Sequence, residues 1–229
     1  MRFSFVTIHP EFISSYLRFG VFSSATKSGA CSFDVINLRD FAVDHHGSID
    51  DRAYGGGDGM VMRPEPLARA VEHIRQESPN AKVVFPSPQG LLWKHSLAED
   101  TVSKGIEHLV FICGRFGGID QRFIDLYVDL QFSLGDFVLS GGELASLSIG
   151  DSLLRLIPGV LGNKDSSLND SFAEGNDGLL EAPQYTRPPV FEGKAVPEVL
   201  MQGNHKLIKQ WRQEQSKQVT ERLRPDLLD

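Results

Sequence analysis

The fold of this chain is decided by a short apolar run that ends in glycines, Leu109-Val110-Phe111-Ile112-Cys113-Gly114-Arg115-Phe116-Gly117-Gly118. The run is continuously apolar from Leu109 to Cys113, which is typical of a strand covered on both faces in a parallel sheet. The glycines after it let the backbone turn tightly or approach a ligand closely. The sequence therefore predicts a buried strand whose carboxyl end opens into a binding loop.

A second glycine-rich stretch, Asp136-Phe137-Val138-Leu139-Ser140-Gly141-Gly142-Glu143, also follows a predicted strand. The chain contains neither the Gly-x-Gly-x-x-Gly turn of dinucleotide-binding folds nor the Gly-Lys-Ser/Thr cradle for phosphate. A site built from backbone in sharp turns, without a phosphate-binding lysine, suits a neutral or cationic adenosine-like ligand better than a triphosphate.

Strands and helices are expected to alternate on either side of these two stretches. The predicted strands cover residues 2–8, 31–38, 81–85, 109–113 and 128–134, and the predicted helices cover residues 64–76, 119–127 and 142–157. Residues 44–59 and 86–90 are predicted to form a loop and a turn. The alternation predicts an α/β fold, a mostly parallel sheet with helices on both faces. Ligands of such sheets bind at the carboxyl ends of the strands.

Bulk composition is that of an ordinary globular protein of 229 residues with a formal net charge of −7. Its two cysteines are too few for a disulfide framework, which favours a reducing compartment. The apolar residues near the amino terminus are interrupted by His9-Pro10-Glu11, and no apolar run reaches the length of a membrane span. We expect a cytoplasmic protein with no membrane partner.

The last third of the chain differs in composition from the rest. Residues 162–178 are rich in Asn, Asp, Ser and Gly, which is typical of a flexible linker. A basic, helical segment follows, in an otherwise acidic chain. We therefore expect a ligand-binding domain over residues 1–161, a linker over 162–178 and a small helical domain over 179–229.

Eight motifs occur in this order along the chain: Asp50-Asp51-Arg52-Ala53-Tyr54-Gly55-Gly56-Gly57-Asp58-Gly59-Met60, Ser87-Pro88-Gln89-Gly90, Cys113-Gly114-Arg115, Gly135-Asp136-Phe137-Val138-Leu139-Ser140-Gly141-Gly142-Glu143, Arg155-Leu156-Ile157-Pro158-Gly159-Val160-Leu161-Gly162, Asp170-Ser171-Phe172-Ala173, Tyr185-Thr186-Arg187-Pro188 and Gly203-Asn204-His205. In these motifs the chain resembles the bacterial tRNA (guanine-N(1)-)-methyltransferase (TrmD) family of trefoil-knotted (SPOUT) methyltransferases. The resemblance implies a deep trefoil knot at the carboxyl end of the sheet domain. It also implies transfer of a methyl group from S-adenosyl-L-methionine to N1 of the guanosine immediately 3′ of the tRNA anticodon. Finally, it implies a homodimer with the active site at the subunit interface.

The resemblance places S-adenosylmethionine on three loops. Its expected contacts are Phe85, Pro86, Ser87, Gly114, Leu134, Gly135, Asp136, Phe137, Val138, Leu139, Gly141 and Gly142. Adenine needs apolar packing and a few backbone hydrogen bonds, and apolar side chains among glycines supply both. The alternative is that all three are ordinary turns at strand ends.

Two residues are expected to carry the chemistry. Asp170 is the expected general base, because methyl transfer to the guanine ring nitrogen needs its proton removed. The alternative for Asp170 is a helix N-cap before Ser171-Phe172-Ala173. Arg155 is expected to stabilise the negative charge that spreads to the exocyclic oxygen. The alternative for Arg155 is an i,i+4 salt bridge to Asp151.

RNA contact is expected from Arg52, Arg115, Phe116, Asn204, His205, Lys209 and Arg212. Cationic side chains bind phosphates, which gives affinity and a dependence on salt. The alternative for the basic tail is a solvated helix face, with Asn204 capping that helix.

Two residues depart from the family pattern. Family members have Tyr and Glu after Cys-Gly-Arg, and this chain has Phe116 and Gly117. Phe116 can still stack on a base, but Gly117 removes a carboxylate near the reacting end of the cofactor. We therefore predict no metal ligands, and a Mg²⁺ requirement only if Glu181 compensates. The departure also leaves open a catalytically impaired tRNA-binding homologue. A hydrolase is disfavoured because the chain lacks a Gly-x-Ser-x-Gly elbow and a His-Glu-x-x-His helix.

Overall fold

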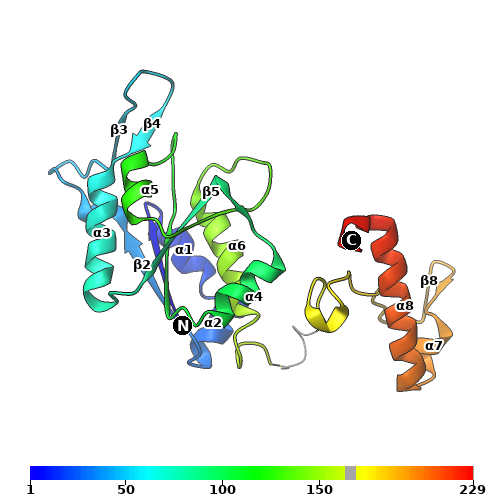
Figure 1. The fold of residues 1–229 in the computed structure, drawn as a ribbon. Helices are drawn as coiled ribbons and strands as arrows, with labels where there is room; N and C mark the ends of the chain where they lie inside the picture. The colour runs from blue at the N-terminus through cyan, green and yellow to red at the C-terminus, as the bar shows by residue number, and fades with distance from the viewer. Residues whose placement is uncertain (163–168, 229) are drawn as a thin grey trace. The chain divides into compact units, whose positions relative to one another are not determined.

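The computed structural model describes residues 1–162 and 169–228, and the chain forms two compact units, Met1–Gly162 and Asn163–Asp229 (Figure 1). The first unit is an α/β domain, as the sequence predicts. Its elements are β1 (Arg2–Thr7), α1 (Pro10–Tyr16), α2 (Gly20–Lys27), β2 (Ser32–Asn37), η1 (Leu38–Phe41), β3 (Asp50–Arg52), β4 (Met60–Met62), α3 (Pro64–Glu77), β5 (Lys82–Leu92), α4 (His95–Ser103), β6 (His108–Ile112), α5 (Gln121–Tyr127), β7 (Leu130–Ser133) and α6 (Gly142–Leu154).

The main sheet has five strands in the order β2-β1-β6-β5-β7, and every pair in it is parallel. All five residues of β6 are buried, because the strand lies in the middle of the sheet. The predicted parallel sheet is confirmed. The trefoil knot stays a prediction from the resemblance.

Helices cover both faces of this sheet, also as predicted. On one face, phenylalanines of β1 and β6 pack against α1, α2, α4 and α6, and the rings of Phe5 and Phe111 lie 5.3 Å apart. On the other face, Val110 and Ile112 of β6 pack with the apolar stripe of α3 and with Phe123 of α5. Because side chains alternate between the two faces along each strand, the sheet contributes to two separate cores.

Three predicted boundaries in the first unit are wrong. Residues 44–59 are not all loop, because β3 and β4 pair as an antiparallel hairpin. The predicted turn at residues 86–90 lies inside β5, where Pro86 and Leu91 both pair with Phe132 and the residues between them bulge outward. Helix α6 ends at Leu154, three residues before the predicted end at Ile157, and Arg155 is its C-cap residue.

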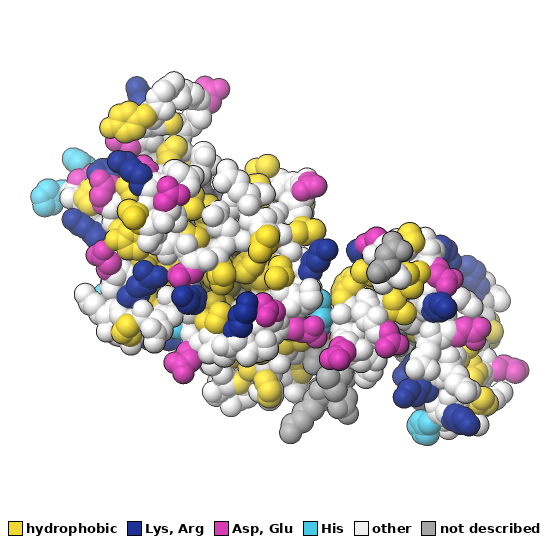
Figure 2. Space-filling view, viewed as in Figure 1, with side chains coloured by type: hydrophobic (Ala, Val, Ile, Leu, Met, Phe, Trp, Pro, Cys, Tyr) yellow, Lys and Arg dark blue, Asp and Glu magenta, His cyan; other side chains and the backbone are white. Residues whose placement is uncertain are grey.

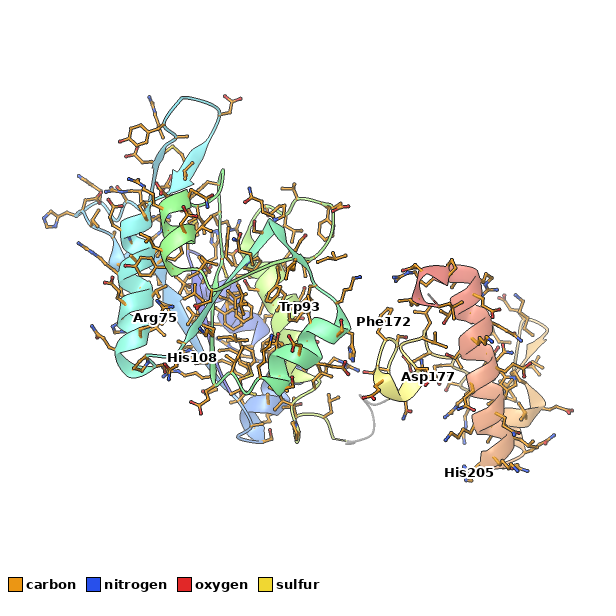
Figure 3. All side chains as sticks on the ribbon, viewed as in Figure 1. Arg75, Trp93, His108, Phe172, Asp177 and His205 are labelled. Atoms are coloured by element: carbon orange, nitrogen blue, oxygen red, sulfur yellow. The ribbon has the colours of Figure 1, made fainter. Side chains whose placement is uncertain are left out.

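The second unit contains η2 (Glu174–Asn176), β8 (Val190–Phe191), β9 (Lys194–Ala195), α7 (Glu198–Met201), α8 (His205–Leu223) and η3 (Pro225–Leu227). Figure 3 shows His205 at the start of α8 and shows Phe172 and Asp177 on the segment around η2. The structure adds one element to the predicted helices, the small β8–β9 hairpin.

Part of the predicted linker is folded. Residues 163–168 lie outside the described residues, but Phe172 N–H donates to Leu179 O at 2.9 Å and Gly178 N–H donates to Ala173 O at 3.0 Å. Two buried hydroxyls of α8 bind the backbone of Leu180, just after this segment: Ser216 donates to Leu180 O, and Thr220 Oγ1 accepts from Leu180 N–H at 3.0 Å. The extent of the linker between the predicted domains stays a prediction.

Candidate cofactor pocket and catalytic residues

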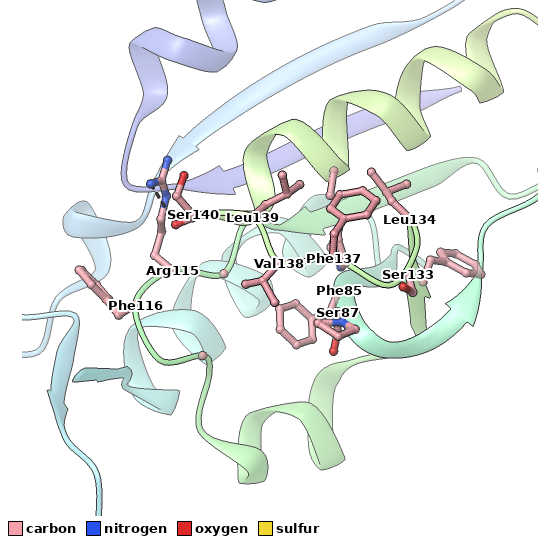
Figure 4. A pocket seen from close by; sticks show the side chains of 18 of the residues that line it. Phe85, Ser87, Arg115, Phe116, Ser133, Leu134, Phe137, Val138, Leu139 and Ser140 are labelled. Carbon is pink, nitrogen blue, oxygen red and sulfur yellow. Dashed lines mark hydrogen bonds between the residues drawn. The ribbon is translucent and has the colours of Figure 1, made fainter. Parts of the chain in front are cut away.

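A pocket of about 230 Å³ lies at the carboxyl edge of the sheet, where the irregular part of β5 meets the loops after β6 and β7 (Figure 4). It is lined by eleven of the twelve predicted cofactor residues: Phe85, Pro86, Ser87, Gly114, Leu134, Gly135, Phe137, Val138, Leu139, Gly141 and Gly142. Asp136 is the exception and does not line the pocket. Segments far apart in the sequence therefore form one concave surface, although which ligand they bind stays a prediction.

Two glycines set the distance between α6 and the loop that follows β6. Gly142 N–H donates to Gly114 O at 2.8 Å, so the first turn of α6 is bound to that loop. A Cβ atom on Gly142 would lie 2.8 Å from the backbone nitrogen of Gly114, closer than real Cβ atoms approach. A Cβ atom on Gly114 would lie 2.9 Å from Cε2 of Phe85. The close approach of backbone predicted from the glycines is therefore present at these positions.

The third loop, residues 134–142, begins with a turn that requires glycine. Gly135 has a φ of +147°, and Phe137 N–H donates to Gly135 O at 2.9 Å. The turn leaves Phe137 and Val138 exposed at the mouth of the pocket (Figure 4). The pocket thus combines backbone polar groups with an apolar rim, as small-molecule sites usually do.

The wall of the pocket contains an ion pair that sequence reasoning missed. Glu143, in the first turn of α6, has a side chain only 2% exposed; its Oε2 accepts from Arg115 Nε at 2.9 Å and its Oε1 accepts from Thr7 Oγ1 at 2.8 Å. Arg115 also donates to Ser140 O at 3.3 Å. A glutamate in the first turn of an otherwise apolar helix was the signal available. Arg115 was predicted to contact RNA, and here its guanidinium joins three segments of the pocket wall.

The cysteine next to the pocket is not a nucleophile. Complete burial raises the pKa of Cys113 to about 12, against the opposing effect of its hydrogen bond to Ser146, 3.5 Å from its sulfur. The thiol therefore stays protonated at neutral pH, and an attacking thiolate is not available.

The β3–β4 hairpin is attached to the loop that carries Phe116 and Gly117. Gly117 N–H donates to Met60 O at 2.7 Å, and Met62 N–H donates to Gly118 O at 2.9 Å. A Cβ atom on Gly117 would lie 3.0 Å from Met60 O, so glycine at this departure from the family pattern permits the contact. Phe116 is half-exposed at a φ of +60°, which places its ring at the pocket edge.

The two predicted catalytic residues belong to different units. Arg155 is an exposed C-cap residue of α6, and the predicted partner Asp151 has a pKa raised by burial and opposed by the charge of Arg155. Asp170 lies in the second unit, where its carbonyl accepts from Ala173 N–H at 3.2 Å. The catalytic roles of both residues stay predictions.

The predicted RNA-contacting residues fall on both units. Arg52 is exposed on β3, and His205, Lys209 and Arg212 are exposed on α8. Asn204 caps α8, as predicted, because its Oδ1 accepts from Leu207 N–H at 3.3 Å. The RNA contacts of all these residues stay predictions. Within residues 1–162 and 169–228, no cluster of three or more His, Cys, Asp or Glu side chains is suited to a metal ion. Across the same part of the chain, no helix is long and apolar enough to cross a membrane.

Comparison with known proteins agrees with this architecture. A family model described as tRNA (Guanine-1)-methyltransferase TrmD matches residues 1–229. The chain is 46% identical over 228 residues to the tRNA (guanine-N(1)-)-methyltransferase of Geobacter sulfurreducens, covering 100% of this chain and 91% of the relative. It is 48% identical over 225 residues to the enzyme of the same name from Neisseria meningitidis serogroup C, covering 98% of this chain and 88% of the relative. The matching enzyme of Rickettsia akari is 44% identical over 225 residues, covering 97% of this chain and 95% of the relative. The chain belongs to the tRNA (Guanine-1)-methyltransferase TrmD family.

Proposed function

We propose that this protein transfers a methyl group from S-adenosyl-L-methionine to N1 of the guanosine immediately 3′ of the tRNA anticodon. The observation that carries the proposal is the meeting of three predicted cofactor loops in one pocket, in a chain of this family. The pocket has a backbone-rich wall, an apolar rim and no lysine among its lining residues. That chemistry fits an adenosine-like sulfonium compound and disfavours a nucleoside triphosphate.

When bound, S-adenosylmethionine supplies an electrophilic methyl group carried on sulfur. Asp170 acts on the acceptor: its carboxylate takes the N1 proton, and the electron pair of the N1–H bond becomes available for the new N–C bond. Arg155 donates hydrogen bonds to the exocyclic oxygen of guanine, where negative charge accumulates as the proton leaves.

The Asp170→Asn variant tests this assignment. We expect turnover with unmodified tRNA to fall by about 10²- to 10⁴-fold, the range for loss of a general base. Methyl-donor affinity measured by calorimetry should stay close to that of the wild type. Asp177→Asn is a matched control, because Asp177 is exposed in the same segment and its left-handed backbone suits asparagine. Near-wild-type turnover by Asp170→Asn would reject the base, and absence of methyl-donor uptake even with tRNA present would reject the function.

We further propose that the protein acts in the cytoplasm, where tRNA is found, as a homodimer whose partner completes the active site. Phe137, Val138 and Leu144 expose apolar side chains along the mouth of the pocket and the start of α6. Contiguous apolar groups at such a place mark an interaction surface. Sedimentation equilibrium should give the mass of two chains, and the mass of one chain at every concentration would reject the dimer.

A further inference from the structure

The second unit contains a groove that the proposed chemistry leaves unexplained. It encloses about 840 Å³ and lies between residues 183–189, Val196, helix α7 and the first half of α8. Leu200, Met201 and Ile208 line its apolar part. Residues 183–195 are exposed throughout, so the groove is open along this segment. A volume of this size lies within the range of about 300–1,000 Å³ that is usual for small-ligand sites.

The charge of the groove is entirely positive. Arg187 and Arg212 line it, and its lining includes no Asp or Glu. Within residues 1–162 and 169–228, neither guanidinium has a hydrogen bond or an ion pair. Along α8, Lys206, Lys209 and Arg212 are spaced three residues apart and form a cationic row on one side of the helix. Figure 2 shows Lys and Arg side chains beside the histidine at the end of this unit where α8 begins. Unpaired guanidinium groups beside a groove favour a phosphate-bearing ligand.

The groove also contains an aromatic platform. Tyr185 lines it and is 49% exposed, and its ring centroid lies 6.1 Å from that of Trp211 at an interplanar angle of 58°. Because the two rings meet at an angle, the contact holds the tyrosine without covering both faces of its ring. An exposed aromatic ring beside cations is the arrangement with which proteins bind unstacked nucleobases.

We propose that this groove binds one unstacked nucleotide of the tRNA, with its base on Tyr185 and its flanking phosphates at Arg187 and Arg212. The inference rests on the proposed function, since it takes the macromolecular substrate to be tRNA, and it assigns to the second unit a nucleotide site separate from the methyl-donor pocket. A second copy of this chain is the other candidate occupant. It is disfavoured by the two unpaired arginines, which a protein partner would have to match with buried carboxylates.

The test measures binding of the full chain to unmodified tRNA by fluorescence anisotropy at several salt concentrations, without methyl donor. Tyr185→Ala should weaken binding at least about fivefold, the lower end of the effect of removing an aromatic ring from a base. Tyr185→Phe keeps the ring and should bind as the wild type does. Arg187→Ala should reduce the slope of log K against log salt by about one. Lys194→Ala is the control, because Lys194 is an exposed cation of the same unit that does not line the groove.

Three results would overturn the proposal. One is unchanged affinity and salt slope in both Tyr185→Ala and Arg187→Ala. A second is a loss of affinity in Tyr185→Phe or Lys194→Ala as large as the loss in Tyr185→Ala. A third is a loss of affinity that follows a change of oligomeric state in sedimentation, which would assign the groove to contact between copies. If Tyr185→Ala unfolds the second unit, as judged by Trp211 fluorescence, the slope of Arg187→Ala decides alone. Methyl-donor uptake without tRNA tests the proposed function separately, so the two failures are distinguishable.

Discussion

The close contact between α6 and the loop after β6 makes Gly142→Ala the most informative change in the first unit. The added Cβ would lie 2.8 Å from Gly114 N and 3.0 Å from Cys113 Cα, about 0.6 Å and 0.4 Å inside the 3.4 Å at which ordinary contact begins. All three nearest atoms belong to the backbone, so no side chain can rotate away to make room. Helix α6 and the loop must therefore separate.

The cost follows from three effects. Overpacking of this kind costs about 1–3 kcal/mol. Lengthening the Gly142 N–H to Gly114 O bond costs about 0.5–1.5 kcal/mol more. Alanine in place of glycine at a helix returns about 0.5–1 kcal/mol. We expect Gly142→Ala to lower the free energy of unfolding by about 0.5–4 kcal/mol. It should also weaken methyl-donor binding, because both displaced segments line the pocket.

The assay is urea unfolding followed by the fluorescence of Trp93, in a Trp211→Phe background so that only the first unit is reported. Methyl-donor affinity is measured by calorimetry on the same proteins. Gly162→Ala is the matched control: no atom lies within 4 Å of its Cβ position and its φ is not left-handed, so its effect should stay within about 0.5 kcal/mol. If Gly142→Ala unfolds at the midpoint of the control and binds the donor normally, the steric reasoning is wrong.

Three further predictions concern buried ionisable groups. Glu143→Gln should destabilise the first unit by about 2–4 kcal/mol in urea unfolding, somewhat below the usual cost of breaking a buried pair because Arg115 keeps 24% of its side chain exposed. The control is Glu11→Gln, because Glu11 is an exposed glutamate in the first turn of α1 and its replacement should change stability little. Equal losses of stability in the two variants would refute the role of the ion pair. Burial lowers the pKa of His108 below its ordinary value, so its neutral form contributes stability that is complete above about pH 6.5 and is lost as the pH falls through the folded pKa. The free energy of unfolding should therefore fall from pH 7.5 to 5.5, and His108 should contribute no more than about 1.4 kcal/mol per pH unit to that fall. In His108→Gln the free energy of unfolding should change less with pH. The same pH dependence in the variant and the wild type would contradict the role given to His108. Burial raises the pKa of both Cys31 and Cys113, so neither thiol should react with an aromatic disulfide reagent faster than the chain unfolds, and rapid modification of the native protein would show that the burial is not maintained.

Local pattern was sufficient to predict the elements that obey a simple periodicity. The unbroken apolar run of β6 and the helical spacing of Leu67, Ala70, Val71 and Ile74 in α3 indicated the correct structures. The β3–β4 hairpin was missed because its first strand, Asp50-Asp51-Arg52, is polar throughout. Periodicity carries no information about such a strand.

The candidate site also has features that the sequence predicts and features that it does not. Glycine clusters identified two of the three segments that form the pocket, because a backbone that approaches another backbone must lack side chains. The third segment, residues 85–87, was predicted from the family resemblance alone. They could not reveal that Glu143 binds both Arg115 and Thr7, since the residues of the second contact are 136 positions apart. Only the order of strands in the sheet determines that contact.

The strand order also has a consequence for synthesis on the ribosome. Strand β1 is made first, yet one of its two neighbours is β6, in a register that joins Arg2 to His108. Nascent chains emerge from the amino terminus, so the β6-facing edge of β1 stays unpaired until nearly half of the polypeptide has been translated. Contacts between such distant residues also slow folding. An apolar strand with a free edge is a substrate for chaperones, and we expect the emerging amino-terminal segment to need such protection until β6 has left the exit tunnel.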